Sequence, residues 1–317
     1  MPDISTSQVQ HSVSSLRELL RPVTWIDASR LSRQLDARVV IASETFQHTG
    51  SFKFRAAGNV VLRVPNHRII AASSGNFGQA LAYACLLLNK SCVVVMPDNS
   101  AQVKISAVRE FGGTVDLIDI RTKSRKARVE ELARIDPDAY VASAYDDLFV
   151  IEGNATLGQE LATVGQPFDF TLAPVGGGGL TAGLIQGLRG AGNVTPVMGV
   201  EPLLANDAAR SLAAGRVIAN DTEPQTIADG VRTVSLGDHN WRVLRDGLTG
   251  IVEVTEEQIK TSVRLLFSLA NLKAEPTGAL SVAALLARPE LFRGRTVCCV
   301  VSGGNVDPAV FRSLLEG

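Results

Sequence analysis

Lys53 is the residue of this chain best suited to covalent chemistry, because it stands in the run Ser51-Phe52-Lys53-Phe54 and four consecutive glycines follow at 176–179. A lysine amine attacks an aldehyde only when it is uncharged, which requires partial removal from water or a cationic neighbour. Phe52 and Phe54 could supply the first condition, and Arg55 the second. A surface lysine on an amphipathic helix is the competing interpretation, so the other motifs must decide.

Three further loops each follow a predicted strand, at the edge where ligands gather in open α/β sheets. The segment Ser73-Ser74-Gly75-Asn76-Phe77-Gly78 could hold a carboxylate, although an ordinary helix N-cap would also explain it. The glycine run at 176–179 opens a helix, where free backbone N–H groups could bind a phosphate. The segment Ser302-Gly303-Gly304-Asn305 places a hydroxyl at the end of a strand, although a structural turn is also possible.

The glycine run also permits a different cofactor. Residues 177–182 satisfy the G-x-G-x-x-A pattern of dinucleotide-binding loops, and Glu201 ends the next predicted strand, where an acid binds the ribose. An NAD site is therefore the distant alternative. Against it, the pattern lies in the middle of the chain, and the loops of Lys53 and Ser74 would have no cofactor role.

The elements that must position these loops alternate between short β-branched runs and helical stretches, which predicts an α/β fold with mostly parallel sheets. We expect strands at residues 68–72, 92–96, 114–118, 170–175, 197–200, 250–254 and 297–302. We expect helices at residues 78–89, 103–111, 124–135, 181–188, 256–271 and 278–287. The segment Thr255-Glu256-Glu257-Gln258 resembles a capping box, and Gly112 and Gly113 should close the helix that ends at Phe111.

Composition narrows the class of protein further. The chain has a formal net charge of −1 and is 45% hydrophobic, so nothing favours nucleic acid as a partner, and a small uncharged or zwitterionic ligand fits better. Its apolar runs are too short to cross a bilayer, which predicts a soluble, cytoplasmic protein. The four histidines and the cysteines at 85, 92, 298 and 299 lack the spacing of a zinc site, and we expect buried, reduced thiols.

Taken together, the motifs resemble the fold-type II pyridoxal-phosphate enzymes, specifically the group of serine racemases and threonine or serine dehydratases. The matching segments are residues 44–55, 73–79, 176–179, 199–202, 228–231, 275–278 and 302–305. The resemblance implies a fold like the β subunit of tryptophan synthase, with two open, twisted, mostly parallel sheets flanked by helices. It also implies a homodimer. Residues 1–66 and 147–317 would form a large cofactor-binding domain, and residues 67–146 a small mobile domain that closes over the substrate.

The resemblance also assigns roles to individual residues. Lys53 would form the Schiff base with pyridoxal 5'-phosphate and carry protons on one face of the cofactor, with Phe52 beside it. Ser302 would contact the pyridine nitrogen, and a hydroxyl there favours loss of a β-leaving group over transamination. The other cofactor-binding residues would be Asn76, at the 3-oxygen, and Gly176, Gly177, Gly178 and Gly179, at the phosphate. The substrate would be surrounded by Ser73, Ser74, Asn76, Phe77, Gln79 and, less securely, Ser235.

One departure and one extra match bear on specificity and stability. Phe77 stands where racemases and many dehydratases have a histidine, so a polar contact to the substrate is missing and a bulkier, more apolar substrate such as phenylserine becomes possible.

Glu201, Ala205 and Asp207 have the spacing of the family's divalent-cation site. Two carboxylates and a carbonyl suit Mg²⁺ or Ca²⁺ in a structural role, and the match to the family favours this site over the alternative, a solvated acidic turn.

The sequence therefore predicts a pyridoxal-phosphate ammonia-lyase that converts a β-hydroxy amino acid, L-threonine or L-serine by preference, into a 2-oxo acid and ammonia. Racemisation is the alternative, because Ser74 occupies the position that serves as acid and base opposite Lys53 in racemases. The last motif lies close to Gly317, so no regulatory domain like that of biosynthetic threonine dehydratases is expected.

Overall fold

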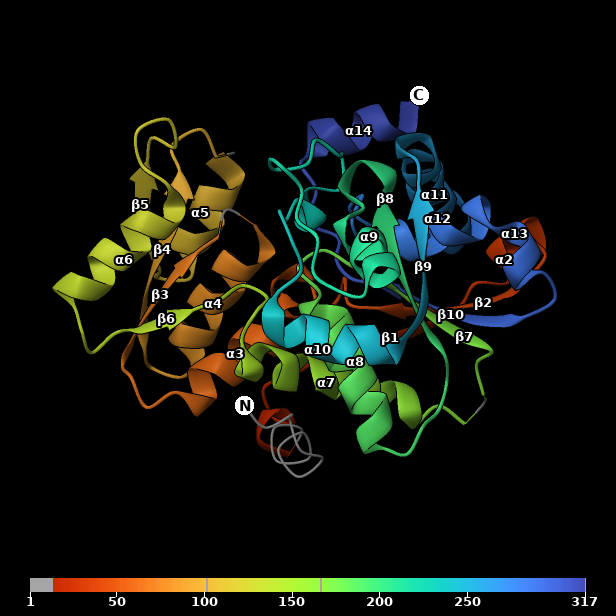
Figure 1. The fold of residues 1–317 in the computed structure, drawn as a ribbon, viewed down its shortest axis with the longest axis horizontal. Helices are drawn as coiled ribbons and strands as arrows, with labels where there is room; N and C mark the ends of the chain where they lie inside the picture. The colour runs from red at the N-terminus through yellow and green to blue at the C-terminus, as the bar shows by residue number, and fades with distance from the viewer. Residues whose placement is uncertain (1–13, 74, 101, 166, 317) are drawn as a thin grey trace.

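The computed structural model describes residues 14–73, 75–100, 102–165 and 167–316, and its strands form two separate sheets. The large sheet has the order β1-β2-β10-β7-β8-β9, and the small sheet the order β5-β4-β3-β6 (Figure 1). Every neighbouring pair is parallel except β1 with β2. The strands are β1 (Thr24–Asp27), β2 (Arg38–Ser43), β3 (Arg68–Ala72), β4 (Ser91–Pro97), β5 (Thr114–Ile118), β6 (Tyr140–Ala142), β7 (Phe170–Pro174), β8 (Val197–Pro202), β9 (Leu248–Val254) and β10 (Thr296–Val301).

Helices cover both faces of each sheet, as expected where parallel strands are joined by crossover connections. They are α2 (Ser29–Leu35), α3 (Lys53–Arg63), α4 (Asn76–Leu87), α5 (Gln102–Glu110), α6 (Arg125–Ile135), α7 (Leu148–Ala162), α8 (Gly179–Gly190), α9 (Asp207–Ala214), α10 (Asp238–Gly247), α11 (Glu256–Ala270), α12 (Leu280–Ala287), α13 (Pro289–Phe292) and α14 (Pro308–Glu316). Short 3₁₀ helices are η1 (His48–Gly50), η2 (Leu203–Ala205) and η3 (Asp229–Val231). The predicted α/β fold with mostly parallel sheets is confirmed.

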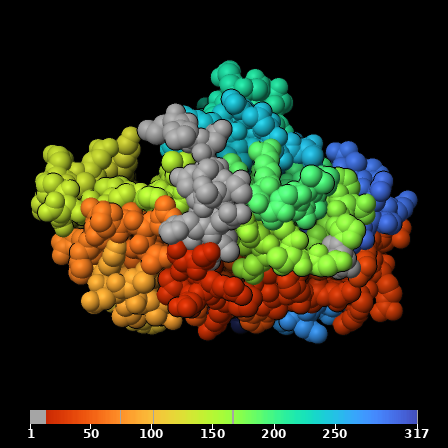
Figure 2. Space-filling model, turned by 90° about the horizontal axis from the view of Figure 1, so that it is seen from below, coloured from red at the N-terminus to blue at the C-terminus, as the bar shows by residue number. Residues whose placement is uncertain are grey.

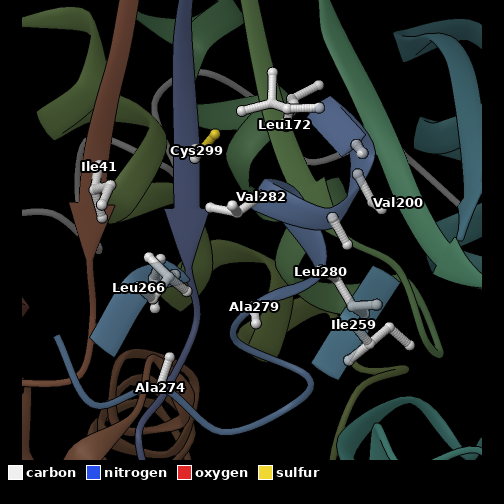
Figure 3. Packing of buried hydrophobic residues seen from close by; sticks show 14 of the residues in the cluster. Ile41, Leu172, Val200, Ile259, Leu266, Ala274, Ala279, Leu280, Val282 and Cys299 are labelled. Carbon is white, nitrogen blue, oxygen red and sulfur yellow. The ribbon is translucent and has the colours of Figure 1, made fainter. Parts of the chain in front are cut away.

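The central strand β10 shows how the sequence builds the core of the large sheet. Because side chains alternate between the faces of a strand, Val297, Cys299 and Val301 pack in one layer, and Cys298 and Val300 pack in the other. Figure 3 shows α12 in the first layer, lying against the strands that carry Cys299 and its neighbours. A strand buried on both faces reads as a continuous apolar run, which explains the hydrophobic stretch at 297–301.

The small sheet is built in the same way. Ile69 and Ala71 of β3 pack under α3, α4 and α5, whereas Ile70 faces α6 through Val129. We call β3 to β6 with α4 to α6 the small unit and the large sheet with its helices the large unit. Figure 2 shows the two in contact, with the N-terminal residues in red along the lower edge.

Several details of the sequence prediction are confirmed. All four cysteines are buried and free, and Thr255 and Gln258 form the predicted capping box at the start of α11. Gly112 has φ +78° and lies just beyond the end of α5. Among the described residues, no helix is long and apolar enough to span a membrane.

Candidate functional site

Lys53 is the first residue of α3, and its amine lies among aromatic side chains at the junction of the two units. The Nζ atom lies 5.0 Å from the ring centre of Phe52 and 5.9 Å from that of Phe77, and it donates a hydrogen bond to the carbonyl of Ala144 at 2.7 Å. Burial lowers the pKa of the amine from 10.5 to about 8, although the charge of Glu275 opposes the shift. A substantial fraction of Lys53 is therefore uncharged just above neutral pH, as a nucleophile requires.

The prediction that Arg55 lowers the pKa of Lys53 was wrong. The guanidinium of Arg55 is fully buried and is held in ion pairs by Glu44, at 2.7 Å, and Glu160, at 2.6 Å. These two carboxylates therefore balance the charge of Arg55. Burial is the largest cause of the lowered pKa of Lys53. Phe54 also has a different role, because its ring packs in the core against His48 and Tyr83.

Backbone hydrogen bonds bring the Lys53 loop against the loop that follows β10. The N–H of Phe52 donates to the carbonyl of Ser302 at 2.9 Å, and the N–H of Gly304 donates to the carbonyl of Gly50 at 3.0 Å. The hydroxyl of Ser302 is buried, with 1% of the residue exposed, and makes no hydrogen bond to any described residue. Since a buried hydroxyl without a partner is costly, this one is suited to a ligand that supplies the partner.

The glycine run at 176–179 lies where other chain segments leave no room for side chains. A Cβ atom at Gly177 would lie 2.2 Å from the ring of Tyr145, and one at Gly176 would lie 2.9 Å from the Cα atom of Val231. Gly178 has φ +94°, which favours glycine, and α8 begins at Gly179. The first turn of α8 has backbone N–H groups without acceptors inside the helix, so the loop can bind an anion.

The 73–79 segment follows β3 and begins α4, but its side chains make contacts that the sequence did not reveal. The hydroxyl of Ser73 accepts a hydrogen bond from the N–H of Gly78 at 3.1 Å, so it provides a partner for one N–H group in the first turn of α4. The amide of Gln79 donates to the carbonyl of Thr49 at 2.9 Å, beside the Lys53 loop. Phe77 is 1% exposed, and its ring lies near the amine of Lys53. Ser74, the predicted acid and base of racemisation, lies outside the described residues.

Glu275 is a residue of this region to which sequence analysis gave no role. Its Oε1 atom accepts a hydrogen bond from the amide of Asn76 at 2.8 Å, and the Oδ1 atom of Asn76 accepts another from Asn305 at 2.9 Å. Burial and the nearby charge of Asp229 raise the pKa of Glu275 to about 8. Glu275 thus fixes the orientation of Asn76, and the only sequence signal for it was its place in the 275–278 motif.

The predicted substrate residue Ser235 lies in the connection between η3 and α10, where it is partly buried. Its neighbour Leu236 would contact a side chain added at Gly178, so this connection runs beside the glycine loop. The structure thus places Ser235 near the predicted phosphate site rather than among the residues of the 73–79 segment. Its contact with a substrate stays a prediction.

The predicted cation ligands Glu201, Ala205 and Asp207 are all buried at the end of β8 and the start of α9. Glu201 accepts hydrogen bonds from the N–H groups of Ala208, at 3.2 Å, and Ala209, at 2.7 Å, while the Oδ2 atom of Asp207 has no partner among the described residues. Burial raises the pKa of Glu201, and it raises that of Asp207 to about 6. The described residues contain no cluster of three or more His, Cys, Asp or Glu side chains suited to a metal. The divalent-cation site stays a prediction from the sequence.

The donor set near Lys53 matches the functional groups of pyridoxal phosphate. An amine with a lowered pKa suits its aldehyde, the glycine loop at the start of α8 suits its phosphate, and the buried hydroxyl of Ser302 suits its ring nitrogen. Phe52, Lys53 and Ser302 are brought together by the hydrogen bond between the loops. The residues present fit this cofactor.

Comparison with known proteins supports the same conclusion. A family model described as pyridoxal-phosphate dependent enzyme matches residues 16–303. The L-threo-3-hydroxyaspartate ammonia-lyase of Pseudomonas sp is 37% identical over 294 residues, which cover 90% of this chain and 92% of that protein. The serine racemase of Schizosaccharomyces pombe is 30% identical over 286 residues, with coverages of 89% and 88%.

Among solved structures, a threonine deaminase from T.th. matches with a TM-score of 0.89 and 35% sequence identity, covering 96% of this chain and 99% of that chain. The resemblance to fold-type II enzymes drawn from the motifs is thereby confirmed. With a matching family model over most of its length and relatives that include ammonia-lyases and a racemase, this chain belongs to the family of pyridoxal-phosphate dependent enzymes.

Proposed function

We propose that this protein is a pyridoxal-phosphate dependent ammonia-lyase that converts a 3-hydroxy amino acid into a 2-oxo acid and ammonia. The strongest support is the desolvated amine of Lys53, which lies beside Phe52 and is joined through its loop to Ser302. When bound, pyridoxal phosphate supplies an electron sink for the negative charge that develops at the substrate Cα atom. Lys53 would accept the proton from that atom, and the 3-hydroxyl group would leave as water.

Ser302 supports elimination rather than transamination. Its hydroxyl is the buried group without a partner at the predicted ring-nitrogen position, and unlike a carboxylate it does not hold that nitrogen protonated. Asn76 would face the 3-oxygen of the cofactor, with its amide held by Glu275 and Asn305. The glycine loop, at residues 176–179, would bind the phosphate. The substrate would be enclosed by Ser73, Ser74, Asn76, Phe77, Gln79 and Ser235.

The preferred substrate is proposed to be a 3-hydroxy amino acid with a second carboxylate, L-threo-3-hydroxyaspartate, ahead of L-serine and L-threonine. This choice is supported by the 37% identical protein of Pseudomonas sp, which is named for that substrate. The reaction would yield oxaloacetate and ammonia, since loss of water leaves an enamine that tautomerises and hydrolyses. L-Serine and L-threonine, the substrates predicted from the motifs, would be converted more slowly.

Three further features belong to the same proposal. The small unit, within the predicted domain of residues 67–146, would move toward the large unit when substrate binds, which would exclude water from the reaction. Two copies of the chain would form a homodimer. Glu201, Ala205 and Asp207 would bind Mg²⁺ or Ca²⁺, which would neutralise two buried carboxylates. A cytoplasmic location stays a prediction from the sequence.

The experiment incubates the purified, cofactor-loaded enzyme with L-threo-3-hydroxyaspartate, L-serine, L-threonine and L-threo-3-phenylserine. Ammonia, 2-oxo acid and D-amino acid are measured in the same samples. We expect 2-oxo acid and ammonia in equal amounts, and a loss of about 100- to 10,000-fold in rate for Lys53→Met, because the variant lacks the proton acceptor. The control is Lys126→Met, which changes an exposed lysine of α6 and should keep full activity.

Each outcome distinguishes one proposal from another. D-amino acid in excess of 2-oxo acid would identify a racemase and would assign the second acid and base to the segment that contains Ser74. Phenylserine as the best substrate would show that Phe77 selects apolar side chains. Absence of all products from a properly loaded enzyme would contradict the ammonia-lyase proposal.

A further inference from the structure

A cavity lined with cations lies between the small and large units. Its volume is about 450 Å³, which is large enough for a small dicarboxylic amino acid. The small unit lines it with Asn99, Ser100, Lys104 and Arg125, and the large unit lines it with Glu223 and Arg232. Among the described lining residues, three are cations and one is a carboxylate, so the wall favours an anionic ligand.

The cavity adjoins the site around Lys53. Lys104 crosses between the units to form an ion pair with Asp229, with 2.7 Å between Nζ and Oδ2. Asp229 is the first residue of η3, and Val231 at the end of η3 packs against Gly176 of the glycine loop. The charges of Lys104 and Lys53 both act on Glu275, lowering its pKa against the effect of burial. Lys104, Lys53 and Glu275 are therefore close enough for their charges to interact.

The side of the cavity formed by the small unit follows the end of β4. β4 pairs with β3, and the N–H of Ser73 donates to the carbonyl of Val95 at 3.2 Å. The segment at 97–100 that lines the cavity therefore runs beside the segment at 73–79, which is proposed to hold the substrate. Lys104 lies in the first turn of α5, the helix that follows this segment, and so belongs to the same edge of the small sheet.

Lys104 is the best candidate of the three cations because its amine lies at Asp229, the first residue of η3, whereas the guanidinium groups of Arg232 and Arg125 are held by other partners. An ammonium group has three N–H donors, and the hydrogen bond to Asp229, at 2.7 Å, uses one of them. Arg232 is already held by the carbonyl of Thr226 through its Nε and Nη2 atoms, and Arg125 is paired with Glu223 at 3.4 Å. The side chain of Lys104 is 38% exposed, so a ligand can reach it without displacing Asp229.

We propose that Lys104 binds the second carboxylate of a dicarboxylic substrate and selects it over neutral 3-hydroxy amino acids, with Arg125 reinforcing the positive field. This inference rests on the proposed ammonia-lyase function and names the residue that determines its substrate class. Lys104 is a specificity residue that contacts the side chain, whereas proton transfer at the Cα atom stays with Lys53.

The test compares Lys104→Met, which keeps the length of the side chain but removes its charge, with Lys104→Arg and Lys126→Met. In the first variant kcat/KM for L-threo-3-hydroxyaspartate should fall by about 10- to 100-fold, the usual loss for a hydrogen bond to a charged group, while kcat/KM for L-serine changes by less than about threefold. Lys104→Arg should restore part of the loss, because it keeps the charge. Lys126→Met should match the unmodified enzyme for both substrates.

A second measurement does not depend on turnover. L-Aspartate and L-alanine both lack the 3-hydroxyl group and cannot lose water, so their dissociation constants can be measured from the change in visible absorbance of the loaded enzyme. Lys104→Met should weaken binding of L-aspartate by a similar factor of about 10 to 100 and leave L-alanine unchanged. Thermal unfolding of each variant shows whether it is folded.

The results separate this inference from the proposed function. Equal effects of Lys104→Met on both substrates, or none on either, would overturn the role of Lys104 while leaving the ammonia-lyase intact. Elimination from L-serine but not from L-threo-3-hydroxyaspartate by the unmodified enzyme would do the same. If no substrate loses water, the proposed function fails, and the comparison of L-aspartate with L-alanine still decides whether Lys104 binds a second carboxylate.

Discussion

The lysine that makes this site reactive also lowers the stability of the protein without its cofactor. The pKa of Lys53 is about 8 in the folded chain and 10.5 as an ordinary lysine. Below pH 8 the folded protein must therefore keep a charge that is poorly solvated, at a cost of about 3–4 kcal/mol. As the pH rises from about 8 to 10.5 the folded protein binds fewer protons than the unfolded chain, so this cost disappears and stability rises.

Lys53→Met should consequently stabilise the cofactor-free protein at pH 7 relative to the original chain, by about 3–4 kcal/mol plus any gain from packing. The stability gained by Lys53→Met should be larger at about pH 7 than at about pH 10, since the cost of the lysine charge depends on pH and packing does not. Urea unfolding at both values measures it, with Lys126→Met as the control. An advantage of the same size at the two pH values would show that the amine is well solvated in the folded protein.

At the scale of elements, the glycine loop depends on how closely the start of α8 approaches the segment that leads into α7. A Cβ atom at Gly177 would meet the ring of Tyr145 at 2.2 Å, so Gly177→Ala must displace either the loop or the ring. We expect cofactor affinity to fall more than about tenfold, because backbone N–H groups of the loop would leave the phosphate. Equilibrium titration with pyridoxal phosphate measures this loss.

The double variant Gly177→Ala with Tyr145→Ala tests the steric cause, since removal of the ring opens the space that the new methyl group needs. It should regain part of the affinity relative to Gly177→Ala alone. Gly250→Ala is the matched control in strand β9, where the added atom would meet only the Cε atom of Met198 at an ordinary 3.5 Å. Unchanged affinity in Gly177→Ala would mean that the loop does not hold the phosphate.

Three of the four strands of the small sheet, β3, β4 and β5, were predicted from the sequence, whereas the three-residue strand β6 was missed. β3 and β5 begin and end at the predicted residues, because short β-branched runs between turn signals have few alternative structures. The helix α7 was missed, since Gly153 and Gly158 weaken a helical pattern and none of its positions is exposed, which removes the amphipathic period. Those glycines are explained only by packing, as a Cβ atom at Gly153 would lie 2.3 Å from the carbonyl oxygen of Arg55.

In the candidate site too, the motifs could be predicted from the sequence but the contacts made by packing could not. Lys53 and Ser302 could be proposed from their motifs, and the structure brings their loops into contact. The ion pairs of Arg55 could not be inferred, because Glu160 lies on α7, a helix that was not predicted. The contact between Glu275 and Asn76 joins two motifs distant in sequence, and only the folded chain shows which side chain meets which.

For the whole molecule, the proposed cation site should act on stability rather than on chemistry. Glu201 and Asp207 repel each other, and the Oδ2 atom of Asp207 has no partner among the described residues. A divalent ion would reduce the repulsion and would supply that oxygen with a partner. We expect millimolar Mg²⁺ or Ca²⁺ to raise Tm by about 3–6 °C. Differential scanning calorimetry of the cofactor-loaded enzyme measures the shift.

Glu201→Gln should abolish this response, because it removes one of the two carboxylates that would hold the ion. Glu257→Gln, on the exposed start of α11, is the matched control. A response to the ion that survives Glu201→Gln would locate the stabilising ion elsewhere.

The position of β10 in the large sheet has a consequence for biosynthesis. β10 lies between β2 and β7, so the sheet stays divided until one of the last strands to be made is inserted, and only then can Ser302 meet the loop of Lys53. Such long-range pairing forms late and slowly. A growing chain on the ribosome therefore has no complete cofactor pocket. The cofactor can therefore bind only after β10 has entered the sheet, so it stabilises the finished fold and does not assist the folding steps before it.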